Sequence, residues 1–280
     1  MSSRRAYPNP ATVSRIHPLT RAARKAPKVA CIAFMVASAL AAPALLSQAL
    51  AAPLNQAPPP DLVRTIARRE SETQAARDQY AFRQTVIVEE LDDRGARKGE
   101  YRQVRDIIFS PGRERIEKIV EAPAPSLKRL ILTPEDFSDI RDIQPFLFRE
   151  EHRRLYEVRF RGEETIDGVA CWVLQVRPRQ ILDGQRLFEG MLWAAQSDAS
   201  IVRMDGRAAP DIRTKGSEHL FPRFTTVRRP VDGRHWFPVH TYADDTLNFR
   251  HGLVRIRLTV RYANYQRFGA ESTITFEPKP

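Results

Sequence analysis

Histidine and carboxylate side chains are the groups of this chain that could bind a metal ion or transfer protons. His235, His240 and Asp244 lie close together in a segment rich in aromatic residues. On a regular strand the two histidines, five positions apart, point to opposite faces of the sheet. Only a bulge near Pro238 would bring them together, so the spacing favours surface or half-buried histidines, and we expect no metal site.

Two pairs of adjacent acids, Asp92-Asp93 and Asp244-Asp245, are the candidates for a general acid and base. Aspartate is common in turns because its side chain bonds nearby backbone N–H groups, so we expect turns or loops at both pairs. The sequence contains no G-x-S-x-G, S-x-x-K or H-E-x-x-H motif. Carboxylate-based active sites leave no short signature, so an envelope enzyme is an alternative, but we expect a protein without enzymatic activity or cofactor.

Arginines form rows on two predicted strands. Arg255, Arg257 and Arg261 project from one strand, and Arg159 and Arg161 project from another. A row of cations can bind anionic lipid headgroups, which makes an anionic membrane surface a candidate partner for Arg255, Arg257 and Arg261. The alternative is a solvated outer face that discourages aggregation.

The elements that carry these side chains are mainly β-strands. From Tyr80 onward apolar residues recur at every second position, most clearly in 156–161 and 254–263. This alternation is typical of an antiparallel sheet with one buried and one solvated face. Further strands are predicted at 82–91, 101–109, 115–120, 172–176, 187–193, 201–204, 221–231, 236–242 and 274–276.

Turns and two helices connect the strands. Hairpin signals occur at Asp92–Gly95, Asp167-Gly168, Asp183-Gly184 and Asp232-Gly233. A first helix is predicted at 62–78 with Asp61 as its N-cap. A second begins at Pro134, where Thr133 is the N-cap and acids follow in the first turn.

The apolar face of the sheet is the candidate ligand-binding surface. A curved sheet with large apolar side chains either packs on helices or encloses a cavity. Two helices are few for about ten strands, which favours a cavity, and a packed core is the alternative. The candidate residues are Phe82, Val86, Tyr156, Val158, Phe160, Trp172, Leu174, Trp236, Ile256, Leu258 and Val260.

The first fifty residues have the pattern of an export signal. Basic residues without acids precede an uncharged, alanine-rich run from Val29, and Ala49-Leu50-Ala51 offers a cleavage site. We expect a signal peptide at 1–51, a proline-rich spacer at 52–60 and one domain at 61–280, located in the periplasm. An uncleaved leader that anchors the chain in the inner membrane is the alternative.

Charge and cysteine content fit an exported single domain. The whole chain carries +11, but seven of those charges precede residue 52, which leaves +4. The basic character therefore belongs largely to the leader, and we expect no nucleic-acid partner. Cys171 is the one cysteine after the leader, so an internal disulfide is excluded.

One stretch resembles a known family. The residues are Asp167-Gly168-Val169-Ala170-Cys171-Trp172-Val173-Leu174-Gln175-Val176-Arg177-Pro178, followed by Gly190-Met191-Leu192-Trp193, a turn at Ser197-Asp198, and Ile201-Val202-Arg203-Met204-Asp205-Gly206. They are similar to a hairpin and strand pair of the LolA-like group, the periplasmic lipoprotein carriers and outer membrane lipoprotein-sorting proteins. The resemblance implies an unclosed antiparallel half-barrel with helices as a lid over a cavity that shields acyl chains.

The chain also departs from this group. Ala194-Ala195-Gln196 replace the usual acidic residue after the strand tryptophan, and 210–224 has no assigned counterpart. From the resemblance we carry over the fold and the ligand class and no individual functional residue. We expect a curved antiparallel half-barrel that carries acyl chains, lipoprotein or another apolar ligand. A regulatory or envelope-stress protein that binds a partner protein is the alternative.

Overall fold

The computed structural model describes residues 57–110, 112–142, 148–181, 186–214 and 218–268. The chain divides into two units, Met1–Leu50 and Ala51–Pro280, and the described residues all belong to the second. The predicted signal peptide, residues 52–56 of the spacer, the Asp183-Gly184 turn and the strand at 274–276 lie outside the described residues. Among the described helices, none is long and apolar enough to cross a membrane.

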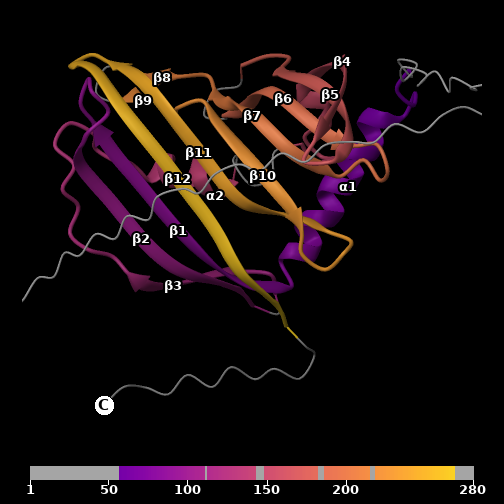
Figure 1. The fold of residues 1–280 in the computed structure, drawn as a ribbon, viewed down its shortest axis with the longest axis horizontal. Helices are drawn as coiled ribbons and strands as arrows, with labels where there is room; N and C mark the ends of the chain where they lie inside the picture. Colours follow the sequence, from indigo (N-terminus) through magenta and orange to yellow (C-terminus); the bar gives the residue numbers. More distant parts are fainter. Residues whose placement is uncertain (1–56, 111, 143–147, 182–185, 215–217, 269–280) are drawn as a thin grey trace, which may run out of the picture. The chain divides into compact units, whose positions relative to one another are not determined.

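The core of the fold is a ten-stranded sheet in the order β3-β2-β1-β12-β11-β10-β7-β6-β5-β4 (Figure 1). All pairings are antiparallel. Among the described strands, β3 and β4 lie at the two edges and each pairs on one side only, so the sheet is not closed. The mainly β, unclosed antiparallel fold is thus confirmed. The strands are β1 Tyr80–Leu91, β2 Arg97–Phe109, β3 Arg115–Glu121, β4 Tyr156–Ile166, β5 Val169–Pro178, β6 Leu187–Ala195, β7 Ile201–Ala209, β10 Phe224–Pro230, β11 Trp236–Phe249 and β12 Gly252–Arg267, and a separate hairpin pairs β8 Ile212–Arg213 with β9 Glu218–His219.

Two α-helices accompany the sheet, α1 Leu62–Arg77 and α2 Pro134–Asp142, and a short 3-10 turn spans Arg153–Leu155. At α2 the predicted cap is present: the backbone N–H of Asp136 donates to Thr133 Oγ1, and the N–H of Thr133 donates to Asp136 Oδ2. The cap predicted for α1 is wrong. The Asp61 carboxylate bonds no backbone N–H of the helix and instead accepts the hydroxyl of Thr65.

Hairpin turns predicted within the described residues are present. Asp167 and Gly168 have φ of 49° and 82°, the left-handed pair that a two-residue hairpin requires. Asp92 Oδ1 accepts the backbone N–H groups of Arg94 and Ala96. The loop expected at Asp244-Asp245 is wrong: both residues lie inside β11, which runs on to Phe249.

The two faces of the sheet differ sharply. The inner face, defined here as the one that carries Phe82, Val86 and Val88 of β1, packs with Ile66 of α1 and Ile140 of α2 in one large cluster. Both helices therefore pack on the same side. The outer face carries charged residues and a small cluster around Cys171 and Val202.

A buried ion pair fixes α1 to the sheet. Both terminal nitrogens of Arg228, on β10, lie 2.7 Å from the Glu70 carboxylate of α1. Each side chain is only 1% exposed. A bidentate pair in this setting specifies one position for the helix, because either charge left alone in the core would be costly.

Candidate functional site

An apolar hollow lies between the inner face and a small cover. We use "cover" for α2 together with residues 128–132, which have no regular secondary structure. The hollow has a volume of about 30 Å³ and is lined by Val88, Leu130, Leu132, Asp136, Ile140, Leu220, Phe221, Pro222, Leu247, Ile256 and Leu258. This is room for one or two water molecules, so the inner face is packed in this conformation and an acyl chain would enter only if the cover moves.

Most of the predicted ligand-binding residues are in the core. Ile256 and Leu258 line the hollow itself. Val158 is half-buried and packs against the main cluster. The other predicted residues that lie inside this cluster are Phe82, Val86, Tyr156, Trp172, Leu174 and Val260.

Two predicted residues differ from this group. Trp236 packs with Cys171 and Val202 in the outer cluster, which corrects its assignment to the inner face. Adjacent strand residues point to opposite faces, and Phe237 is fully buried with its ring packed against those of Tyr80 and Tyr265. Phe160 is 36% exposed although its ring packs against Trp172, because β4 is an edge strand.

Glu90 anchors the cover to the end of β1. Its carboxylate, 3% exposed, accepts the backbone N–H of Lys128 at 2.9 Å, of Arg129 at 2.6 Å and of Leu130. Sequence reasoning missed this residue. The available signal was an acid at the next inward position after Val86 and Val88, where the alternation calls for an apolar side chain.

Buried polar contacts hold α2. Asp139 lies 2.5 Å from Arg186, and both side chains are nearly inaccessible. His219 of β9 contacts Thr133 Oγ1 at 3.3 Å. Burial raises the pKa of Asp136, which caps the same helix. The cover is therefore attached by a few directional contacts beside its apolar packing.

The two acid pairs meet in one groove. Asp92-Asp93 and Asp244-Asp245 line an open cavity of about 750 Å³, together with Lys98, Arg129 and Arg255. Burial opposes ionisation of Asp244, but hydrogen bonds from Arg257 and Arg255 lower its pKa overall. Backbone donation from Ala96, followed by Lys98, lowers the pKa of Asp92. A general acid at neutral pH needs a raised pKa, so these two carboxylates are not poised for that role.

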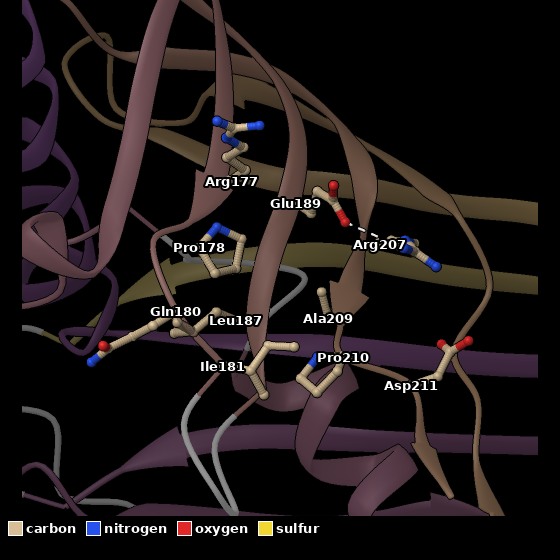
Figure 2. A pocket seen from close by; sticks show the side chains of 10 residues that line it. All are labelled: Arg177, Pro178, Gln180, Ile181, Leu187, Glu189, Arg207, Ala209, Pro210 and Asp211. Atoms are coloured by element: carbon tan, nitrogen blue, oxygen red, sulfur yellow. Dashed lines mark hydrogen bonds and ion pairs between the residues drawn. The ribbon is translucent and has the colours of Figure 1, made fainter.

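A second cavity, of about 270 Å³, opens at the ends of β5, β6 and β7. Figure 2 shows its apolar residues Leu187 and Pro210 below an ion pair that joins Glu189 to Arg207. The residues that line it are Arg177, Pro178, Gln180, Ile181, Leu187, Glu189, Arg207, Ala209, Pro210 and Asp211. None of them is a histidine, cysteine, serine or lysine, so the pocket offers none of these nucleophiles.

The arginine rows are mostly engaged in ion pairs. Arg255 and Arg257 both lie within 3.2 Å of Asp244. Arg159 is 2.7 Å from Glu157, and Arg161 bonds Gln175. These contacts reduce the charge available to a membrane, and binding through Arg255, Arg257 and Arg261 stays a prediction.

The histidines are not assembled into a metal site in the described part of the chain. His235 Nδ1 lies 2.7 Å from Asp232 Oδ2 in the β10–β11 turn. Within the described ranges, no three His, Cys, Asp or Glu side chains come together as a possible ligand set.

Comparisons with known proteins identify no family for this chain. No family model and no curated protein matches the chain. A DUF1329 family protein from Desulfovibrio piger is similar at 13% identity and a TM-score of 0.37, over 77% of this chain and 96% of its own.

Two further similar structures belong to the group that the sequence resembles. A LolA superfamily protein from Nitrosomonas europaea has 14% identity and a TM-score of 0.31, over 72% of this chain and 94% of its own. A putative outer membrane lipoprotein-sorting protein domain from Vibrio parahaemolyticus has 11% identity and a TM-score of 0.33, over 73% of this chain and 92% of its own. Likenesses this weak carry no information about ligand, partner or activity.

Proposed function

We propose that this chain is an exported carrier that holds an acyl chain, of a lipid or lipoprotein, or another apolar ligand against the inner face of its sheet. The observation that carries the proposal is the apolar hollow beneath a small, separately anchored cover. Leu130, Leu132 and Ile140 supply apolar contacts that a ligand could take over when the cover moves outward.

Burial alone would supply the binding energy. Removing ten methylenes from water is worth about 8 kcal/mol before the costs of association and of opening the cover. No cofactor takes part. Release would follow from a second opening of the cover or from transfer to a competing acceptor, since tight burial makes spontaneous dissociation slow.

The periplasm is the proposed location. The basic, then alanine-rich segment that ends at Ala51 supports export, and the uncleaved, membrane-anchored form is the alternative. The intact mass of protein recovered from the periplasm distinguishes the two forms.

The experiment compares co-purified lipid between two matched variants of the full chain. Ile140→Glu places a charge beside the hollow, where Ile140 is 3% exposed, whereas Ile131→Glu changes a neighbouring cover residue that is 84% exposed. Protein isolated without detergent is extracted and analysed by mass spectrometry. We expect stoichiometric acyl lipid with wild type and Ile131→Glu and little with a folded Ile140→Glu. Absence of an apolar guest in all three would contradict the proposal.

A second candidate, binding of a partner protein, is favoured by the free edge at β3. Ile116, Ile119 and Val120 are 47%, 60% and 47% exposed on a strand with one open side. Such an edge can receive a strand from another protein. Ile119→Pro would then abolish a stoichiometric protein complex while lipid content stays unchanged, and a complex that survives this change would exclude β3 as its site.

A further inference from the structure

A row of buried polar side chains crosses the inner face beside the apolar region. Gln84 of β1 lies opposite Tyr262 of β12 on one side and opposite Arg105 of β2 on the other. Gln84 is 2% exposed and Tyr262 is 5% exposed. Polar groups at such depth require partners, so this row needs an explanation in an otherwise apolar surface.

Three guanidinium groups gather at this row. The Glu117 carboxylate lies 2.5 Å from Arg105 and 2.7 Å from Arg115, which places the two arginines side by side. Arg77, at the end of α1, lies over the ring of Phe109 at 6.0 Å and interacts electrostatically with Arg115 and Tyr262. Burial lowers the pKa of Arg77 to about 10, a sign that its charge is poorly solvated.

Several donors of this group are unused. Within the described residues, Arg105 Nε and Arg115 Nη2 are buried and form no hydrogen bond. The hydroxyl of Tyr262 is buried as well, and its polar neighbours are the side chains of Thr241 and Gln84. Burial also raises the pKa of Tyr262, so its hydroxyl keeps its proton and can donate. Two carboxylates, Glu117 and Asp78, lie beside these three arginines, so the group carries an excess of positive charge. A group with several unused donors and excess positive charge fits an anion that accepts hydrogen bonds.

The position suits an amphiphile. Val88 and Leu258, which line the hollow, stand opposite each other, and Gln84 and Tyr262 stand opposite each other four residues along the same strands. Four strand residues span about 13 Å. Val86 and Val260, both fully buried, fill the distance between them with apolar surface. At the β3 side the face opens, since Ile119, opposite Arg105, is 60% exposed.

We propose that Tyr262, Arg105 and Arg115, with Arg77 nearby, bind the anionic head, a carboxylate or phosphate, of an amphiphile whose chain lies along Val86 and Val88. This inference rests on the proposed function and names its ligand class. An anionic head supplies acceptors for the unused donors and a counter-charge for the guanidinium groups. A neutral head of the same chain length supplies no counter-charge.

The test measures the preference for an anionic head. Full-length protein is loaded with the neutral fluorophore N-phenyl-1-naphthylamine, which is displaced by dodecyl phosphate or by dodecan-1-ol below their micelle concentrations. We expect dodecyl phosphate to compete about tenfold or more better than the alcohol. Arg105→Gln and Arg115→Gln are expected to bring this ratio close to one while dodecanol affinity is retained.

Two controls separate head recognition from folding. Arg102→Gln changes an arginine of the same strand that pairs with Glu121 on the outer face, and it should leave the ratio unchanged. Tyr262→Phe removes one hydroxyl and should lower the ratio with little change in thermal midpoint. A wild-type ratio near one, or an unchanged ratio in folded Arg105→Gln, would overturn the inference and leave the carrier proposal standing. Failure of both dodecyl phosphate and dodecan-1-ol to displace the fluorophore would contradict both this inference and the carrier proposal.

Discussion

Glu90 connects the sheet to the cover through a single carboxylate. Three successive backbone N–H groups, of Lys128, Arg129 and Leu130, converge on it, so the segment is held by charge-assisted hydrogen bonds. A side-chain amide at this position would turn one of its two groups from acceptor to donor. Opening of the cover should therefore respond more strongly to a substitution of Glu90 than to a substitution of similar size among the apolar side chains of the cover.

We predict that Glu90→Gln loosens the cover. The variant should lose about 1–3 kcal/mol of stability, and amide hydrogen exchange at 128–130 should become faster. Glu89→Gln is the matched control, because Glu89 is next in the chain and points to the outer face near Arg97 and Arg257. It should change stability by less than about 0.5 kcal/mol. Equal exchange in the two variants would mean that Glu90 does not hold the cover.

Tyr156 gives the fold a dependence on alkaline pH. Its hydroxyl is buried and accepts the backbone N–H of Phe188, and burial raises the pKa of Tyr156 to about 12. Below pH 10 both folded and unfolded chains keep this proton, and the contribution to stability is fully present. As the pH rises from 10 towards 12 only the unfolded chain ionises, so stability falls.

The predicted loss from Tyr156 amounts to about 2–3 kcal/mol across that pH range. Urea unfolding at pH 9 and pH 11.5 measures it. Tyr156→Phe should show a smaller decrease between the two pH values than wild type. Tyr242→Phe, at a residue that is 39% exposed, should show the wild-type decrease. Parallel behaviour of wild type and Tyr156→Phe would assign the alkaline sensitivity elsewhere.

At the scale of elements, α1 is held by a contact that sequence patterns do not reveal. The strands, α1 and α2 were predictable from local signals: alternation for the strands, an apolar edge for α1 and capping residues for α2. The pairing of Glu70 with Arg228 joins residues far apart in the chain, and each reads as an ordinary surface charge. Gly190 and Gly206 are a second pair whose role no local pattern indicates. They stand opposite each other on neighbouring strands, and the ring of Phe188 fills the space that a side chain at either position would need.

We predict that Arg228→Met destabilises the protein by about 3–5 kcal/mol, because Glu70 is left as a buried charge without its partner. The double variant Glu70→Leu/Arg228→Met should recover most of that loss. Chemical denaturation of wild type, Arg228→Met and the double variant measures the free energy of unfolding of each, and hence how strongly the two side chains are coupled. Additive losses in the double variant would show that the two side chains act independently.

The cover and the site were only partly predictable for a related reason. The capping box predicted where α2 begins, but 128–132 has no periodic pattern, so nothing local indicates that it lies over the sheet. Likewise, alternation predicted an apolar inner face correctly but could not distinguish a packed core from a cavity. That distinction depends on how distant segments such as 220–222 fill the space.

At the scale of the whole described domain, the sheet is open, and its inner face is covered in the middle and exposed at both edges. Phe160 on β4 and Ile119 on β3 mark the exposed ends. Apolar side chains of the cover occupy the middle, and arginines lie between the middle and β3. In the proposed function, the cover moves outward to admit an apolar chain and then returns over it.

Photo-crosslinking tests this central claim most directly. A long-chain fatty acid with a diazirine near its methyl end is irradiated with the full-length protein, and the labelled residues are found by peptide mass spectrometry. We predict adducts around the hollow, at Val88, Leu130, Ile140 or Leu258, and their loss in Ile140→Glu. Adducts confined to the outer face, around Trp193 and Trp236, would contradict it.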